Sequence, residues 1–431
     1  MSGHRSSGAS SERGRGHRWK VLGVGFAANA SFSAAFSGIP TTAVFIRSGY
    51  HVDNHALGLL FGMLGLGIAV SELPWGVLTD RWGDRRVLLL GLGLTAAALA
   101  AMAVFVSPKG AYVPGVPMLA AGLLLVGLLG GSVNGSSGRA VMAWFREGER
   151  GLAMSIRQTA VPAGGGIGAL VLPALAAWHG FACVYGVLAV LCAVTAGFAW
   201  RWLHEPPAVE GAARATHATR EEARTAPPVS PLRDIRIWRT ALGMGVLCVP
   251  QLSVVTFATV FLHDFGRAGL LTISITMAAV QTGAAIMRVW SGHWTDRHGN
   301  RRAYMRACSL ITALLFAPLA VLTAGVGASH AAMAIVFAAM IVLGGVSASA
   351  WHGVAYTELA TLAGTSRAGT ALAIGNTCVF MTMFLTPLAI PLVLSVGSWP
   401  LVWAAGSLCA LLALPVFPRA AVSRGVKPAQ A

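Results

Sequence analysis

Twelve apolar segments, each of about twenty residues or more, recur along the chain and constrain its fold more than any other feature. A helix needs about 20 mostly apolar residues to cross the roughly 30 Å hydrocarbon layer of a bilayer. We predict spans at 20–44, 55–78, 87–106, 115–143, 152–175, 181–203, 238–262, 270–294, 304–326, 329–352, 369–395 and 398–420. The alternation of polar and apolar residues that marks a membrane β-barrel does not occur in them. The sequence therefore predicts an all-α polytopic membrane protein.

The composition excludes most other classes of protein. Charged residues make up 11% of the chain and hydrophobic residues 55%, whereas soluble proteins carry about 25% charged residues. An ordinary cytosolic enzyme, a secreted scaffold and a disordered chain are therefore excluded. A net charge of +16 invites a nucleic-acid partner, but the basic residues lie in short segments between the apolar runs. We expect the lipid bilayer as partner and no nucleic acid.

The basic residues predict the orientation of the chain in the membrane. With the N-terminus inside, 25 of the 31 Lys and Arg residues lie on the inner side, and such a bias places both termini in the cytoplasm. Arg greatly outnumbers Lys, and Ala and Gly are abundant, which favours a GC-rich bacterium and its inner membrane. The predicted organisation is an N-terminal tail (1–19), a six-helix bundle (20–203), a cytoplasmic central loop (204–236), a second six-helix bundle (237–420) and a C-terminal tail (421–431).

A long motif occurs twice. After the second span the chain reads Gly76-Val-Leu-Thr-Asp80-Arg81-Trp-Gly83-Asp-Arg85-Arg86, and after the eighth span Gly292-His-Trp-Thr-Asp296-Arg297-His-Gly299-Asn-Arg301-Arg302. The two copies are offset by 216 residues (292 − 76), about half the chain. A second echo aligns 151–159 with 369–377. The chain is therefore predicted to consist of two six-helix halves related by a parallel repeat.

The doubled pattern GxxxDRxGxRR resembles the signature of major facilitator superfamily transporters. The resemblance implies twelve helices in two bundles around a central cavity that opens alternately to each side, with substrate bound near the bilayer midplane. It also implies a transporter rather than an enzyme, without a cofactor and without need of a partner subunit, so a monomer is expected. A channel or a membrane-embedded enzyme is the remote alternative, because the sequence shows no nucleophile–base set, metal cluster or phosphate-binding loop.

The resemblance implies that the motif forms a gate. Asp80 would lie at the cytoplasmic end of the second span, beside the N-terminus of the eleventh, whose free N–H groups attract an acid. Asp296 would do the same toward the fifth span. Glycines would allow close helix approach (Gly76, Gly292) and tight turns (Gly83, Gly299). The motif arginines would pair with acids and lipid headgroups: Arg81, Arg85, Arg86, Arg297, Arg301 and Arg302. The alternative is that the motif only sets topology through its positive charge.

Four charged residues fall within predicted spans, where a charge costs at least about 2.5–3.5 kcal/mol. Glu72 and Arg288 occupy equivalent positions (288 − 72 = 216), each eight residues before its motif aspartate and on the same helical face. Glu72 is the candidate proton carrier, and a structural or gate pair is the alternative. Arg157 is a candidate substrate ligand, because its planar fork suits a carboxylate, although it could instead snorkel to the cytoplasm. Arg139 is expected to serve the gate.

Further polar residues on predicted spans are candidates to line the cavity, although helix–helix hydrogen bonds would explain them equally well. They are Asn29, Gln158, Gln251 and Asn376, and Arg288 is a further candidate to bind the substrate.

Two resemblances within the superfamily compete for the substrate. Trp144-Phe145, followed by Glu149-Arg150-Gly151-x-Ala153, is similar to a segment of organic-anion transporters. Three arginines facing one glutamate inside the membrane also favour a small anion, such as a carboxylate, moved with protons or by exchange. The alternative is a drug:proton antiporter, whose fifth span carries GPxxGG. Here Val161 replaces the leading glycine and Arg157 an earlier one, which weakens that interpretation.

Overall fold

The computed structural model describes residues 5–52, 54–204, 230–326 and 333–418. In the first half the helices are α1 (Arg5–Phe36), α2 (Ala43–Gly49), α3 (Asn54–Trp82), α4 (Asp84–Phe105), α5 (Val116–Gly130), α6 (Ser132–Trp144) and α7 (Arg150–Trp202). In the second half they are α9 (Ile235–Val260), α10 (Leu270–His298), α11 (Arg301–Val326), α12 (Ala334–Ser349), α13 (His352–Ala363), α14 (Ala368–Val396) and α15 (Trp399–Val416). Short helical turns connect several of them: η1 (Ile39–Thr42), η3 (Pro231–Arg233), η4 (Phe261–Phe265) and η6 (Thr365–Arg367).

The number of membrane crossings agrees with the sequence prediction. Ten helical stretches within the described residues are long and apolar enough to cross a bilayer. One of them, α7, has 53 residues, and at about 1.5 Å per residue it would be far longer than a bilayer is thick if it were straight. Its backbone breaks at Gly180 (φ 74°, ψ −178°), which divides it into the fifth and sixth spans. With α10 as the eighth span, the all-α fold with twelve crossings is confirmed for the described part of the chain.

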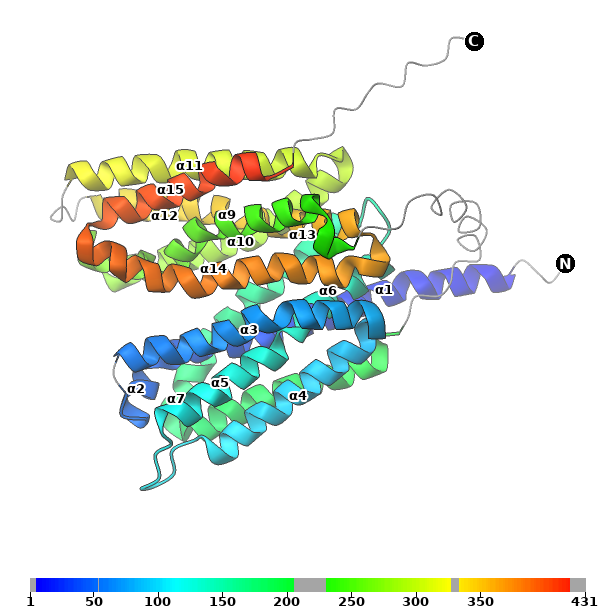
Figure 1. The fold of residues 1–431 in the computed structure, drawn as a ribbon, viewed down its shortest axis with the longest axis horizontal. Helices are drawn as coiled ribbons and strands as arrows, with labels where there is room; N and C mark the ends of the chain where they lie inside the picture. Colours follow the sequence, from blue (N-terminus) through cyan, green and yellow to red (C-terminus); the bar gives the residue numbers. More distant parts are fainter. Residues whose placement is uncertain (1–4, 53, 205–229, 327–332, 419–431) are drawn as a thin grey trace, which may run out of the picture.

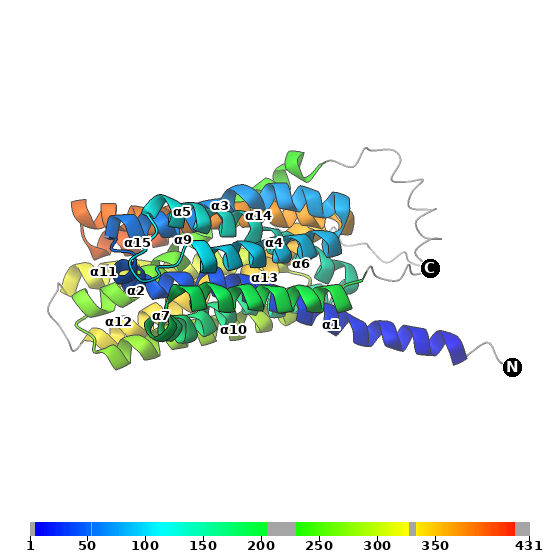
Figure 2. The same ribbon diagram turned by 90° about the horizontal axis from the view of Figure 1, so that it is seen from below.

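The helices of the two sequence halves form two bundles that lie side by side (Figure 1). At their boundary α3 packs against α14 and α7 packs against α10, and the first of these pairs is visible in both views (Figures 1 and 2). The α3–α4 and α10–α11 turns, which carry the repeated motif, lie at the same end of the molecule, and we call this end the motif end. There one apolar cluster includes residues of both halves, among them Met154, Trp351 and Leu372. The bundles are therefore closed together at the motif end.

Two predicted boundaries differ most from the structure. Helix α1 begins at Arg5 rather than at residue 20. The tenth span was predicted to end at residue 352, but α13 continues it to Ala363. Its polar residues did not end the helix because neighbours satisfy them: Glu358, for example, is 2.6 Å from Arg302 in an ion pair. Most of the predicted central loop (205–229) and the predicted C-terminal tail (421–431) lie outside the described residues.

Candidate functional site

Asp80 at the motif end of α3 joins the two halves. Its carboxylate accepts hydrogen bonds from the backbone N–H groups of Gly369 (2.9 Å) and Thr370 (2.8 Å). Helix α14 begins at Ala368, so these N–H groups belong to its first turn and have no partner within the helix. The positive end of the helix and the carboxylate stabilise each other.

Asp296 makes the equivalent contact from the second half. It accepts from the N–H groups of Gly151 (3.0 Å) and Leu152 (2.9 Å), in the first turn of α7. Gly151 and Gly369 are equivalent in the sequence echo, so the two contacts are related by the internal repeat. We call the four hydrogen bonds the outer latch. The expected contacts are present, and their role as a gate remains a prediction.

Glycines make the outer latch sterically possible. A Cβ atom on Gly76 would lie 2.8 Å from the carbonyl oxygen of Gly369, and one on Gly292 would lie 2.8 Å from the carbonyl carbon of Gly151. These positions therefore have no room for a side chain while the latch is closed. The turn glycines adopt positive φ angles, 87° at Gly83 and 63° at Gly299, as expected for tight turns.

The cations beside the two latch aspartates come from different places. Arg301, within the motif itself, forms an ion pair with Asp296 at 3.1 Å. Its counterpart Arg85 instead donates to the carbonyl of Trp200 at 3.0 Å. Arg139 of α6 takes the position beside the first-half acids, 3.6 Å from Asp80 and 3.2 Å from Asp84. Arg302 pairs with Glu358, and three further motif arginines are exposed: Arg81, Arg86 and Arg297.

A second layer of contacts lies two helical turns deeper, about 12 Å from the latch aspartates. The fully buried Glu72 carboxylate accepts from the side-chain amides of Asn134 of α6 (2.5 Å) and Asn376 of α14 (3.3 Å). The guanidinium of Arg288 donates from Nη1 to the carbonyl of Gln158 of α7 (3.0 Å) and from Nε to that of Ser349 (3.1 Å).

This inner lock, formed by the contacts of Glu72 and Arg288 with the opposite half, follows the same internal repeat. Glu72 is equivalent to Arg288, and their partners Asn376 and Gln158 are equivalent in the sequence echo. An acid in one half and a base in the other thus contact residues at equivalent positions across the boundary, Glu72 through a side-chain amide and Arg288 through a backbone carbonyl.

Arg157 lies beside the inner lock. Snorkelling would require its side chain to reach the motif end, and it does not. It is 1% exposed, and it donates to Ser137 Oγ from Nε (3.0 Å) and Nη2 (2.7 Å) and to the Asn134 carbonyl from Nη2 (2.7 Å). Among the residues that the structure describes, neither Arg157 nor Arg288 lies within ion-pair distance of a carboxylate. The centre of the molecule therefore holds two buried cations and one carboxylate.

Three residues of this centre escaped the sequence analysis. Asn134 and Ser137 belong to a polar run, Asn-Gly-Ser-Ser, within an otherwise apolar span, a signal that could have identified them. Tyr356 of α13 lies in electrostatic range of Glu72, Arg157 and Arg288. It was missed because the tenth span was predicted to end at residue 352.

The remaining residues that were predicted to line the cavity, Asn29 and Gln251, make no hydrogen bond to the inner lock among the described residues. Asn29 of α1 is completely buried, and neither atom of its amide has a hydrogen-bond partner within the described part of the chain. Gln251 of α9 is half-buried, with its Oε1 3.8 Å from Cys248 Sγ. No described hydrogen bond joins Gln251 to the inner lock.

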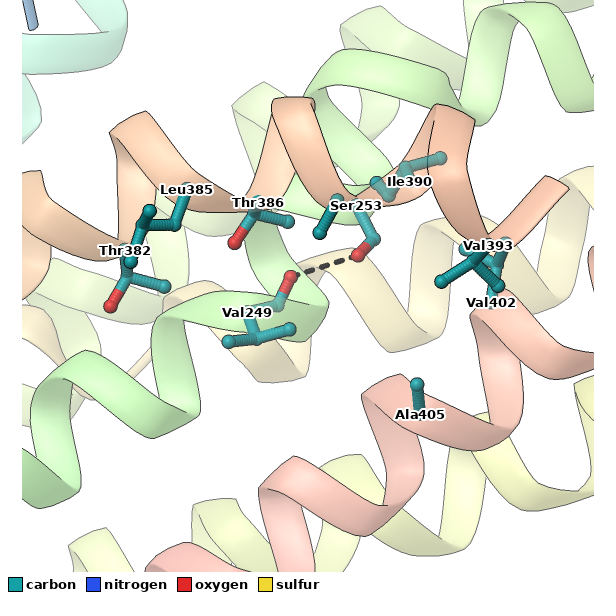
Figure 3. Close-up of a pocket in the computed structure, with 10 residues that line it drawn as sticks. Val249, Ser253, Thr382, Leu385, Thr386, Ile390, Val393, Val402 and Ala405 are labelled. Atoms are coloured by element: carbon teal, nitrogen blue, oxygen red, sulfur yellow. Dashed lines mark hydrogen bonds between the residues drawn. The ribbon is translucent and has the colours of Figure 1, made fainter. Parts of the chain in front are cut away.

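A cavity of about 280 Å³ lies elsewhere, between α9, α14 and α15 (Figure 3). Its lining is mostly apolar, and the hydroxyl of Ser253 donates to the carbonyl of Val249 at 3.0 Å rather than into the cavity. No residue of the inner lock lines it. Because charged groups buried within a membrane mark functional sites, we place the candidate site at the inner lock and Arg157 rather than at this cavity, whose lining holds no charged residue.

Comparisons with known proteins support this architecture. Residues 24–317 and 253–431 match the model of the Major Facilitator Superfamily. An uncharacterized MFS-type transporter of Mycobacterium tuberculosis H37Rv is 30% identical over 408 residues, covering 94% of this chain and 86% of the relative.

Solved structures extend the likeness to the fold. The proton:xylose symporter XylE, bound to 6-bromo-6-deoxy-D-glucose, aligns over 93% of this chain and 95% of its own with a TM-score of 0.71 and 12% identity. The transporter FucP in its outward conformation aligns over 92% and 97% with a TM-score of 0.62 and 14% identity. At these identities the likeness concerns the fold alone.

Proposed function

Since the chain belongs to the major facilitator superfamily and is a membrane transporter, we propose that it moves a small organic anion across the membrane by alternating access. The observation that carries this proposal is the pair of buried arginines, Arg157 from the first half and Arg288 from the second. Both lie at the boundary of the halves without a carboxylate partner in the described residues. Desolvated guanidinium groups that form no ion pair attract an anion strongly.

The described arrangement, closed at the motif end, is one of the two states that alternating access requires. To open this end, the outer latch and the inner lock must both break. A substrate carboxylate competes with the Gln158 carbonyl for Arg288, because a charged acceptor forms the stronger hydrogen bond. Substrate binding thus removes one of the two contacts of the inner lock.

Glu72 supplies the second input. As a carboxylate it accepts from Asn134 and Asn376, whereas a protonated carboxyl loses charge and part of its acceptor capacity. Binding of a proton therefore weakens the contact with Asn376 and with the opposite half. The anion releases the contact of Arg288 with Gln158, and the proton releases the contact of Glu72 with Asn376. We therefore propose that the anion is transported together with a proton.

The proposed setting is the inner membrane of a bacterium, with the motif end and both termini in the cytoplasm and with the protein acting as a monomer. The drug:proton antiporter is not favoured, because the Glu72 carboxylate already accepts from two amides and Arg157 lies in electrostatic range of it. A lipophilic cation would have to enter against that positive charge.

Transport by the purified protein in liposomes tests the proposal. We expect saturable uptake of small carboxylates, stimulated by a proton gradient, and no uptake of lipophilic cations. Arg157→Gln and Arg288→Gln should each reduce carboxylate uptake about 10- to 100-fold, as expected when a hydrogen bond to a charged group worth about 1.5–3 kcal/mol is lost. The matched control is Arg201→Gln, on the exposed end of α7. Binding of lipophilic cations without binding of carboxylates would contradict the proposal.

A further inference from the structure

Asn29 is an exception to the rule that buried polar groups are hydrogen-bonded. Its side chain is 0% exposed, and both Nδ2 and Oδ1 are without partners in the part of the chain that the structure describes. An apolar residue of similar size would fill this position without leaving any polar atom unsatisfied. The amide therefore has a donor and an acceptor available for a partner that is not part of the protein.

Helix α1 packs against the first part of α7, so Asn29 lies near the turns of α7 that follow Arg157. Ser33 Oγ donates to the carbonyl of Val161 at 2.7 Å, and a Cβ on Gly164 would lie 2.9 Å from the Cα of Ala30. Asn29 lies one turn before Ser33, and Arg157 lies one turn before Val161, on the faces of the two helices that meet.

Ser137 provides an independent link between the same two residues. A Cβ on Gly25, one turn before Asn29 on its face of α1, would lie 3.7 Å from Ser137 Cβ. Ser137 Oγ in turn accepts from Arg157. Helices α1, α6 and α7 therefore meet beside Arg157.

Arg157 also has one nitrogen, Nη1, that donates no hydrogen bond within the described residues. Its hydrogen bonds, to Ser137 and to the Asn134 carbonyl, use Nε and Nη2, and Nη1 makes none within the described residues. The neighbourhood thus holds two donors, Arg157 Nη1 and Asn29 Nδ2, and one acceptor, Asn29 Oδ1. Two donors suit a carboxylate, and the acceptor requires a hydroxyl or another donor close to that carboxylate.

We propose that Asn29 and Arg157 form a subsite that selects 2-hydroxy carboxylates, an inference that rests on the anion transport proposed above. The carboxylate accepts from Arg157 and from Asn29 Nδ2, and the adjacent hydroxyl donates to Asn29 Oδ1. A carboxylate without the hydroxyl leaves Oδ1 buried and unsatisfied. Sites that hydrogen-bond a substrate hydroxyl discriminate strongly against the analogue that lacks it for this reason.

The test compares matched acids in competition for transport by the full-length protein in liposomes: lactate against propionate, and glycolate against acetate. We expect the hydroxy acid to compete at a concentration at least about tenfold lower than its deoxy analogue. In Asn29→Leu this preference should disappear, so that the two acids of each pair compete at similar concentrations, both higher than for the unaltered protein because the Nδ2 donor is lost. Ser33→Ala, one turn away on the same face, is the matched control and should keep the preference.

The outcomes are distinguishable. If neither acid of either pair competes or is transported, the anion proposal itself fails. If both are transported without a preference, or if Asn29→Leu keeps the preference, the subsite is overturned and a structural water at Asn29 accounts for the free amide. Should Asn29→Leu fail to fold, Asn29→Ser, which retains one hydroxyl, should reduce the preference, and an unchanged preference in that variant would equally overturn the subsite.

Discussion

The two halves of the molecule hold equivalent latches with different charge arrangements. Asp80 and Asp296 each accept two backbone hydrogen bonds from the first turn of a helix in the other half. The cation beside Asp80 is Arg139, from another helix, whereas the cation beside Asp296 is Arg301, from the motif itself. The backbone contact is therefore what both copies of the repeat retain, and the compensating charge is free to come from different positions.

The inner lock differs more strongly between the halves. The equivalent positions hold an acid, Glu72, and a base, Arg288, so the halves respond to different ligands, a proton and an anion. The outer latch thus uses an aspartate in both halves, whereas the inner lock uses an acid in one half and a base in the other. Four predictions, from the largest expected effect to the smallest, test this contrast.

The first prediction concerns the close approach of the halves. Gly76→Leu or Gly292→Leu should prevent closure of the motif end and lower transport at least tenfold, because overpacking typically costs about 1–3 kcal/mol and more against a backbone. Gly93→Leu is the control, since a Cβ on Gly93 meets nothing within 4 Å. A cysteine placed at the buried Ser155, in a background without the six natural cysteines, should react with impermeant thiol reagents only in the closure-defective variants. Unaltered transport and labelling would show that the glycines do not limit closure.

The second prediction separates the two inputs of the inner lock. Glu72→Gln should abolish transport driven by a proton gradient and leave counterflow exchange, because the glutamine cannot change its charge. Glu147→Gln, on an exposed loop, is the control. Radiolabelled uptake with and without a pH gradient measures both modes. An equal loss of both would reject the coupling role of Glu72 and favour a structural one.

The third prediction concerns the outer latch. Asp296→Asn should slow transport more than Asp80→Asn, by a factor of about three to ten, because it leaves Arg301 without its acid whereas Arg139 keeps Asp84. The double variant Asp296→Asn/Arg301→Gln should recover part of the loss. Initial transport rates at saturating substrate give the comparison, and equal effects of the two aspartate variants would show that the neighbouring cations do not matter.

The smallest effect is expected at the turns. Gly83 has φ 87° and ψ 154°, a region accessible almost only to glycine, whereas Gly299 has φ 63° and ψ 20°, in the left-handed helical region. Gly83→Ala should therefore lower stability more than Gly299→Ala, whose cost is about 1–2 kcal/mol. Thermal unfolding of the purified protein measures both changes. A larger loss for Gly299→Ala would mean that the surroundings of the turns, rather than the φ and ψ angles, decide the cost.

Most of the fold could be predicted from the sequence, because lipid requires long apolar helices and the repeat places the motif twice. The partners of the motif aspartates were expected from the family resemblance, and the equivalence of Glu72 and Arg288 from the numbering alone. The tenth span was predicted too short, since local composition does not show that Arg302, 56 residues away in the sequence, pairs with the buried Glu358.

The sequence by itself determined the number of crossings, the two halves, and which residues carry charge into the membrane. Only the tertiary structure decided what the polar groups contact. Glu72 accepts from two amides rather than from an arginine, Arg288 donates to two backbone carbonyls, and the amide of Asn29 has no hydrogen-bond partner among the described residues. The physical reason is range. Hydrophobicity and helix periodicity act along the chain and are visible in local composition, whereas a hydrogen bond in the membrane interior depends on helices that are distant in the sequence and adjacent in space.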